Sequence, residues 1–155
     1  MKPVLFDGID PTDIVQGKLA DCYFLAALAG LAEDEVGEKQ MMQLGERVRD
    51  NFLINKYNEF GIYCMEFYVD GEATEIVVDD WFPFYEDKQG VEQFCFAKAK
   101  IEKDKDGRIV NDDGTGEFWV QIMEKCWAKI CGSYEAAEAG TCAEAFNNID
   151  GTPCQ

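Results

Sequence analysis

The sequence predicts a mixed α+β fold, because helical and strand-like hydrophobic patterns follow one another along the chain. The first signal is "CYFLAALAGLAE" (22–33), which is apolar on every face and predicts a helix in the middle of the core. The second is a pair of β-rich runs around "DGEA", between 61 and 84, which predicts an antiparallel hairpin. The third is the stretch 116–133, where large apolar residues recur at helical spacing. Together they predict one domain with a central helix, further helices and a small antiparallel sheet.

The N-terminal part prepares the central helix. Residues 1–12 contain the turn signals "DG" and "DP" and predict an irregular segment. Either Thr12 or Asp13 can cap a short turn before Gly17 interrupts it. Asp21 can then serve as the N-cap of the central helix. After that helix, residues 34–53 predict a more amphipathic stretch with a polar face.

The second half of the chain continues with strands and a second helix. "VDGE" is the expected hairpin turn, "WFPF" ends the second strand because proline cannot continue the ladder, and "QFCFAKAKI" (93–101) predicts another strand. Residues 102–116 predict a charged surface loop, since its "DKDG" lacks the other ligands of a calcium loop. Gly132 is the expected C-terminal cap of the helix within 116–133, and "YEAAEA" (134–139) predicts a short helical piece.

Composition and charge exclude several classes of function. The 155 residues are 47% hydrophobic, which is enough for a real core, and the net charge is −17. An acidic surface disfavours nucleic acid and anionic membranes and suits cations or a basic partner, although most of the acidic residues need only be solvated. No apolar run is long enough to span a membrane, and the N-terminus does not resemble a signal peptide.

The cysteines predict a reducing environment. Seven are present at irregular spacing, with no CxxC pair, and the chain has no histidine, so a mixed Cys/His zinc site is impossible. Several, such as Cys64 and Cys126, lie in apolar stretches and are expected to be small buried hydrophobes. We therefore expect an intracellular, cytoplasmic protein without structural disulfides.

Cys22 is the strongest candidate for chemistry. It follows the expected N-cap, so it lies on the first helical turn, where unsatisfied amides and the helix dipole favour a thiolate. Gln16 on the preceding loop can donate to an oxyanion together with the backbone amide of Cys22. Taken alone, the same residues also describe a core cysteine beside a loop glutamine, and the charge of Asp21 would oppose a lowered thiol pKa if it faced the sulfur.

Three blocks of sequence carry a resemblance that weighs between these interpretations. "DIVQGKLADCYFLAALAGLAE" is similar to the pattern "DI-x-QG-x-LGDCWFLAA", and "GIYCMEFYVDGEATEIVVDDWFPF" to "GIY…F…GEW…VVVDD-x-LP". "GEFWVQIMEKCWAKICGSYEAAEAGTCAEAF" is similar to "NEFW…LLEKAYAKL-x-GSYEAL-x-GGS…EAL". In this order and over most of the chain, the blocks resemble the calpain family of calcium-dependent cysteine proteases.

The resemblance implies a papain-like core of two lobes, of which residues 1–155 are the first. It implies that Cys22 is the nucleophile, that Gln16 donates to the oxyanion, and that the backbone of Gly140 pairs with an extended protein substrate. The catalytic histidine and asparagine belong to the second lobe, on the same polypeptide or on a partner chain. The lack of histidine in this sequence is then explained, because the lobe that supplies the base is absent.

The resemblance also implies one calcium ion in this lobe. Its ligands would be the backbone carbonyls of Phe6 and Gly8 and the carboxylates of Asp13 and Glu117, all oxygen donors as calcium prefers. The alternative is that both carboxylates are solvated, or that Glu117 is only a first-turn acid of the following helix.

Some positions depart from the family pattern and predict a divergent member. Ala20 and Ala139 stand where the pattern has glycine, Tyr23 where it has tryptophan, and Pro11 where an arginine normally couples the two lobes. The segment 80–117 is also longer than usual. Two functions follow: the cysteine-bearing half of a calcium-dependent endopeptidase, inactive alone, or a non-catalytic structural or docking module of calpain type, with or without a response to calcium.

Overall fold

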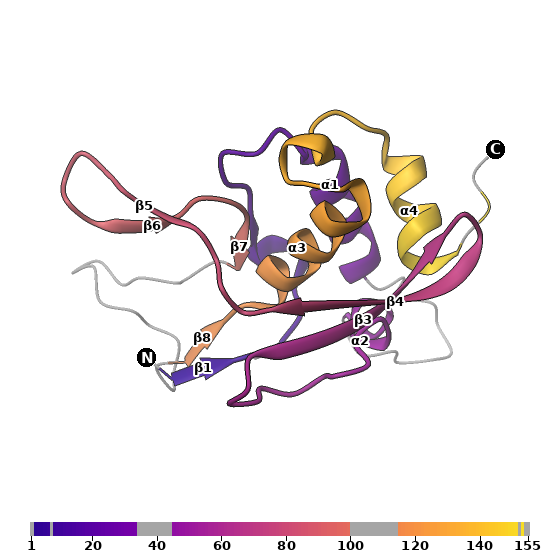
Figure 1. Cartoon of the computed structure of the whole chain (residues 1–155), viewed down its shortest axis with the longest axis horizontal. Coiled ribbons are helices and arrows are strands. Elements are labelled where there is room, and N and C mark those ends of the chain that lie inside the picture. The colour runs from indigo at the N-terminus through magenta and orange to yellow at the C-terminus, as the bar shows by residue number, and fades with distance from the viewer. Residues whose placement is uncertain (1, 7, 34–44, 100–114, 152, 154–155) are drawn as a thin grey trace.

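The structure, a computed structural model, describes residues 2–6, 8–33, 45–99, 115–151 and 153. Three longer helices, α1, α3 and α4, lie beside a long hairpin, and a second hairpin projects at the opposite end (Figure 1). The helical elements are α1 (Cys22–Ala32), α2 (Glu46–Asp50), α3 (Trp119–Cys131), α4 (Cys142–Asp150) and the 3-10 turns η1 (Pro11–Asp13) and η2 (Glu135–Ala137). The strands are β1 (Lys2–Val4), β2 (Ile14–Val15), β3 (Ile62–Val69), β4 (Glu72–Asp79), β5 (Phe84–Glu86), β6 (Glu92–Phe94), β7 (Lys98–Ala99) and β8 (Thr115–Glu117).

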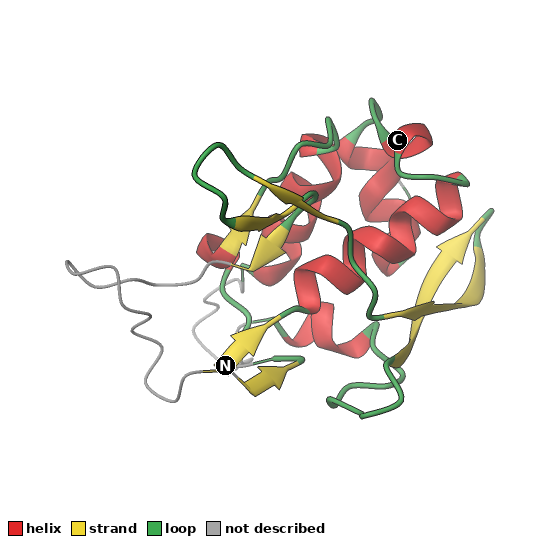
Figure 2. Cartoon of the chain, turned by 60° about the vertical axis from the view of Figure 1, so that its left-hand side comes forward, coloured by secondary structure: helices red, strands yellow, loops and turns green. Residues whose placement is uncertain are grey.

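The strands of the described residues pair two by two. β3–β4, β5–β6 and β2–β7 are antiparallel, whereas β1 and β8 pair in parallel. Figure 2 shows the helices grouped together with these small ribbons around them. The mixed α+β class is confirmed, although one of the small sheets is parallel rather than antiparallel.

Helix α1 is central, as its uniformly apolar sequence predicts. Phe24, Ala27 and Leu28 are fully buried. Phe24 stacks on Trp127 of α3 with 5.1 Å between ring centroids. On another side, Gly30 faces Phe146 of α4, and a Cβ at position 30 would stand 3.2 Å from Cζ of that ring. The predicted packing of the Cys22 helix against the second long helix is confirmed.

The predicted hairpin forms with the expected turn. β3 and β4 pair without interruption, and Asp70 and Gly71 both adopt positive φ, as the twist of a two-residue hairpin turn requires. The inward side chains Tyr63, Met65 and Phe67 are fully buried and form one wall of the core.

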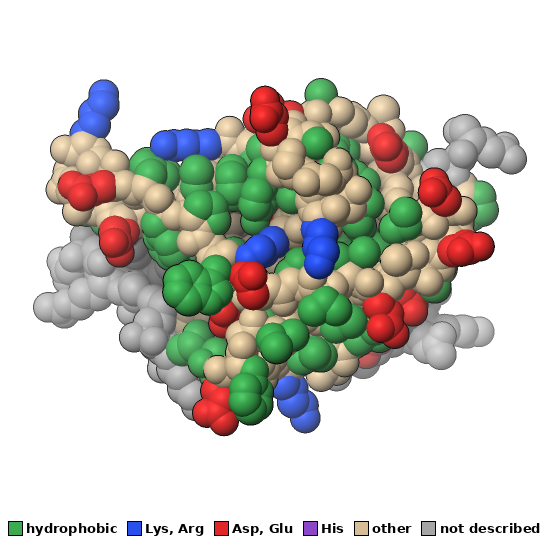
Figure 3. Space-filling model, in the orientation of Figure 1, with side chains coloured by type: hydrophobic (Ala, Val, Ile, Leu, Met, Phe, Trp, Pro, Cys, Tyr) green, Lys and Arg blue, Asp and Glu red, His purple; other side chains and the backbone are tan. Residues whose placement is uncertain are grey.

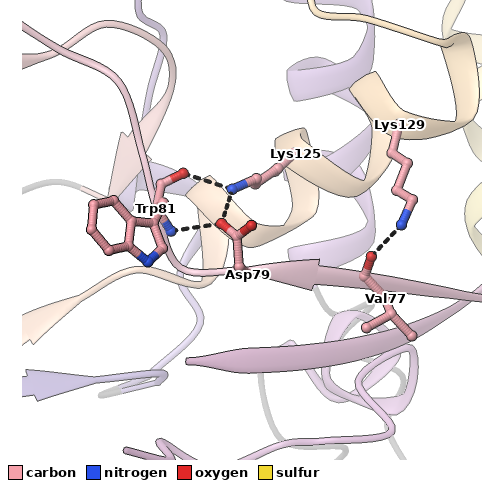
Figure 4. A network of polar contacts seen from close by, with 5 residues as sticks. All are labelled: Val77, Asp79, Trp81, Lys125 and Lys129. Carbon is pink, nitrogen blue, oxygen red and sulfur yellow. Dashed lines mark hydrogen bonds and ion pairs between the residues drawn. The ribbon is translucent and has the colours of Figure 1, made fainter. Parts of the chain in front are cut away.

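Helix α3 ends at Gly132, which adopts the left-handed conformation predicted for the cap. The helix is tied to β4 by two lysines (Figure 4). Lys129 Nζ donates to the Val77 carbonyl at 2.6 Å. Lys125 Nζ donates to the Asp79 carboxylate and, at 2.6 Å, to the carbonyl of Trp81.

Two predicted elements differ in the structure. Within its described part, 93–99, the expected strand is split into β6 and β7, because the segment changes partner at Cys95: the Cys95 amide donates to Pro83 beside β5, and its carbonyl accepts from Lys18 beyond β2. In the N-terminal segment, the cap of η1 is Asp10, whose carboxylate accepts from the Thr12 amide at 2.7 Å, rather than Thr12 or Asp13. The expectation for 34–44 lies outside the described residues, as do positions 102–114 of the charged loop predicted at 102–116. The last two positions of that predicted loop, 115 and 116, belong to strand β8, because they pair with β1. Among the helices that the structure describes, none has the length and hydropathy to cross a membrane.

Candidate active site

Cys22 is the first residue of α1 and its side chain is exposed. The helix starts there because the Asp21 carbonyl accepts from the amides of Phe24 and Leu25, at 2.9 and 3.2 Å. The thiol therefore lies at a helix N-terminus, where the dipole and the unpaired amides favour a negative charge. An exposed thiol in that position is accessible to a substrate.

Asp21 occupies the N-cap position but does not cap the helix with its side chain. The carboxylate is fully buried and contacts the carboxylate of Glu124 from α3. The reason is tertiary: the packing of α1 on α3 brings the side chain that precedes α1 against Glu124. Desolvation raises the pKa of Asp21, and desolvation together with the charge of Asp21 raises the pKa of Glu124 to about 8.

Gln16 follows β2 and belongs to a loop that packs against the segment of Cys95 and Phe96. The Lys18 amide donates to the Cys95 carbonyl at 3.0 Å, and a Cβ at Gly17 would collide with the backbone of Phe96. The exposed Gln16 amide donates to the Leu19 carbonyl at 2.9 Å. A primary amide carries two N–H donors, so this bond uses only one of them.

Gly140 lies beside the residue that follows Cys22. A Cβ at position 140 would stand 2.5 Å from Cζ of Tyr23. The Tyr23 hydroxyl donates to the Ala137 carbonyl at 2.8 Å and accepts from Trp127 Nε1 at 2.9 Å. The segment of Gly140 is thus held against the first turn of α1, with Gly140 itself exposed.

The two substituted glycines differ in consequence. Ala139 adopts φ 63°, a left-handed conformation that alanine reaches only with strain, and its amide donates to the Ala20 carbonyl at 3.3 Å. Ala20 does not have positive φ, so its side chain imposes no such strain on the loop.

The residues expected to hold calcium come from three segments. β1 and β8 pair so that Val4 lies opposite Glu117, which brings Phe6 and Gly8 just beyond the same end of this ribbon. Asp13 ends the turn η1. Among the described residues no three Cys, Asp or Glu side chains form a metal-binding group, and the expected set has only two carboxylates. Asp13 and Glu117 both take part in other interactions.

Two hollows of the described surface lie away from Cys22. One, of about 280 Å³, is lined by five aromatic side chains and, among others, by Glu117 and Gln121. Another, of about 490 Å³, lies between β4 and α3 beside Lys125 and Lys129. Neither of these two hollows is lined by Cys22, Gln16 or Gly140, each of which is exposed.

Sequence reasoning missed two residues near Cys22. Tyr23, which stands where the family pattern has tryptophan, joins α1, α3 and η2 through its hydroxyl. Glu124 had a recognisable signal: it lies four residues after Val120 and three before Trp127, so a charged residue falls within the apolar stripe of α3.

Comparison with known proteins gives the same family over the whole chain. A family model described as "Calpain family cysteine protease" matches residues 1–155. A calpain-type cysteine protease of Oryza sativa subsp. japonica is 34% identical over 151 residues, which are 97% of this chain and 6% of that relative. The calpain-1 catalytic subunit of Mus musculus is 32% identical over 149 residues, which are 95% of this chain and 17% of that relative. The chain therefore spans a small part of the length of these relatives.

Proposed function

Because the chain belongs to the calpain family of cysteine proteases, we propose that it is the cysteine-bearing lobe of a calcium-dependent endopeptidase. Its catalytic histidine and asparagine would then lie in a second lobe, on the same polypeptide or on a partner chain. One observation carries this proposal: an exposed cysteine begins the central helix, in a sequence of 155 residues without histidine.

In this proposal Cys22 Sγ, as the thiolate, attacks the carbonyl carbon of a peptide bond. The carbonyl π electrons move onto oxygen, and this oxyanion accepts from the Gln16 amide and from the backbone N–H of Cys22. When the tetrahedral intermediate collapses, the C–N bond breaks and the amine leaves with a proton from the second-lobe histidine. Water then hydrolyses the thioester and restores the thiol.

The roles of the supporting residues follow from their placement. Gly140 has no side chain to shield its backbone, which suits a strand-like pairing with an extended substrate. Gln16 lies on a loop that is fixed by the hydrogen bond between Lys18 and Cys95, and this bond restricts the position of its amide. Only one of its two donors is used inside the loop, by the Leu19 carbonyl.

A reconstitution assay tests the proposal. The 155-residue chain alone should not hydrolyse a casein substrate, because it has no base. Adding the histidine- and asparagine-bearing lobe of the mouse relative, with calcium present, should give hydrolysis that Cys22→Ala abolishes.

Cys142 offers a matched control for that assay. It is also exposed and also the first residue of a helix, α4. Cys142→Ala should leave the hydrolysis unchanged. Hydrolysis that survives Cys22→Ala would refute the assignment of the nucleophile.

A non-catalytic docking module is the second candidate, and exposed apolar side chains favour it. Phe60 and Trp81, which flank the β3–β4 hairpin, are 80% and 84% exposed. Ile62 and Val77, in the two strands of that hairpin, are about half exposed. Figure 3 shows hydrophobic side chains on one face of the molecule, with basic and acidic side chains among them. Reconstitution without hydrolysis, together with stable association of the two lobes, would favour this function.

The proposed function includes a calcium ion bound to this lobe and a cytoplasmic location. The oxygen donors of Phe6, Gly8, Asp13 and Glu117 fit a hard cation, and an ion there would tie the segment before Gln16 to the start of α3. The six described cysteines are all free thiols, which suits a reducing cytoplasmic setting.

A further inference from the structure

Two buried carboxyl groups, those of Asp21 and Glu124, are in contact, and Asp21 directly precedes Cys22. Asp21 is 0% exposed and Glu124 is 1% exposed, and they come from the start of α1 and the middle of α3. The neighbouring titratable groups are also acidic or phenolic. The charge of Glu138 raises the pKa of Asp21, and the charges of Asp21 and Glu124 raise the pKa of Tyr23 and of Tyr134, respectively. Two carboxylates in such a place repel each other and lose their hydration.

The pair can be satisfied by a single proton. No N–H or O–H of another described residue donates to either oxygen of Asp21. Glu124 does have an outside donor, because the Ala97 amide lies 3.1 Å from both of its oxygens. A proton held between the two carboxyl groups turns their contact into a hydrogen bond. Burial raises the pKa of both groups, which favours retention of this proton.

The pair also connects the two sides of the candidate site. Asp21 directly precedes Cys22 and supplies the carbonyl that starts α1. Through the Ala97 amide, Glu124 holds the segment that supports the loop of Gln16, since the Cys95 carbonyl accepts from Lys18 and β7 pairs with β2. One carboxyl group of α3 therefore contacts both the segment of the nucleophile and the support of the oxyanion donor.

We propose that Glu124 is a positioning residue, which with Asp21 forms a singly protonated carboxyl pair that fixes Cys22 relative to the Gln16 loop. The roles of Cys22 and Gln16 rest on the proposed function, whereas the pair acts on the thiol whether or not peptides are cleaved. Loss of the proton leaves two charges in contact behind the first turn of α1. This both loosens that turn and adds a negative charge beside the thiol.

Alkylation of Cys22 tests the proposal without any proteolysis assay. The intact 155-residue chain is treated with iodoacetamide between about pH 6 and about pH 10, and each cysteine is quantified by peptide mass spectrometry. In the wild type, the rate at Cys22 should follow two ionisations, that of the thiol and that of the pair. Cys142 in the same sample, exposed at the start of another helix, should follow one.

Glu124→Gln separates positioning from simple burial. The amide nitrogen can donate to Asp21 and the amide oxygen can accept from Ala97, so the contacts remain but the titration is removed. We expect Cys22 in this variant to react within about twofold of the wild-type rate near neutral pH and to follow a single ionisation. Glu124→Leu leaves Asp21 and the Ala97 amide without partners and should change the Cys22 rate by at least about threefold while leaving Cys142 unchanged.

The possible outcomes are distinct. Superimposed profiles for the wild type and Glu124→Gln over the whole pH range would overturn the positioning role, even if the reconstituted lobes cleave casein. Different profiles without cleavage after reconstitution would sustain the pair and refute the protease function. If Glu124→Leu does not fold, which circular dichroism would show, the comparison with Glu124→Gln still decides.

Discussion

Gly140 lies against the ring of Tyr23, so closely that a Cβ at position 140 would stand 2.5 Å from Cζ and 2.9 Å from the hydroxyl oxygen. The ring cannot move aside freely, because its hydroxyl group is bound to both Ala137 and Trp127. Tyr23 follows Cys22 directly, so this contact joins the expected substrate wall to the first turn of α1.

Replacement of Gly140 by alanine should therefore destabilise the protein. We expect Gly140→Ala to lower the free energy of unfolding by about 2 kcal/mol, as overpacking against a fixed ring does. Urea denaturation measures the change. With Tyr23→Ala as background the loss should shrink to below about 0.5 kcal/mol, because the colliding ring is gone. A single variant as stable as the wild type would contradict the contact.

Ala139, one residue earlier, should give the opposite result. It holds φ 63° without being glycine, and a left-handed alanine costs about 1 kcal/mol or more. Glycine relieves this strain but gains freedom in the unfolded chain, so we expect Ala139→Gly to raise the free energy of unfolding by about 0.5 kcal/mol. Ala136→Gly is the matched control, since Ala136 is exposed on η2 without positive φ and should be destabilised by glycine. Destabilisation at both positions would contradict the strain at Ala139.

Much of the fold was predictable because its longest elements carry local signals. The turn at Asp70 and Gly71 and the cap at Gly132 each need a residue that tolerates positive φ, and the sequence supplies one. The pairings of β1 with β8 and of β2 with β7 were not predictable. These strands have two or three residues, and their partners lie far away in the sequence, so tertiary contacts decide them rather than local pattern.

The candidate site divides in the same way. The position of Cys22 at the start of a buried helix follows from the apolar run and the polar residue before it. The inward turn of Asp21 does not, because an aspartate in that place normally caps the helix from outside. Its burial depends on Glu124, which is 103 positions further on in the chain, and only the packing of α1 on α3 brings the two carboxyl groups together.

The two lysines of α3 that reach β4 should contribute unequally (Figure 4). Lys125 donates to both the Asp79 carboxylate and the Trp81 carbonyl, whereas Lys129 donates to the Val77 carbonyl. We expect Lys125→Met to cost about 1 kcal/mol and Lys129→Met about 0.5 kcal/mol or less, since single exposed bonds contribute little. Thermal unfolding at low and high salt compares them. Equal losses, or a loss at Lys125 that does not shrink with salt, would contradict this account of the contacts.

The buried pair should make stability depend on pH. Between the ordinary glutamate value of 4.5 and the raised pKa of Glu124, about 8, the folded protein retains a proton that the unfolded chain has lost. The free energy of unfolding therefore falls as the pH rises through this window, by up to about 1.4 kcal/mol per pH unit. Glu124→Gln removes this dependence, and the difference between the two curves isolates it from the repulsion of the remaining negative charges.

Glu92→Gln is the control for that comparison, because Glu92 is an exposed carboxylate whose removal changes the net charge equally. Its stability curve should run parallel to that of the wild type. Parallel curves for the wild type and Glu124→Gln between pH 4.5 and 8 would show that the pair does not hold a proton.

Calcium binding should depend on Asp13 and Glu117 together. Their carboxylates come from η1 and from β8, and the carbonyls of Phe6 and Gly8 follow the strand that pairs with β8. With only two carboxylates among its ligands, the site should be weaker than a full calcium loop, and we expect one ion per chain, bound in the range of about 10⁻⁴ to 10⁻³ M. Isothermal titration calorimetry of the wild type, Asp13→Ala and Glu117→Gln measures this.

Each substitution should weaken calcium binding at least about tenfold, because a hard cation loses one of its two charged ligands. Asp50→Asn, an exposed carboxylate on α2, should leave the titration unchanged. Binding that survives in Asp13→Ala would place the ion on other acidic residues of this chain of net charge −17. Absence of saturable binding at millimolar calcium would remove calcium control from this lobe, and the protease function would then have to be regulated through its second lobe.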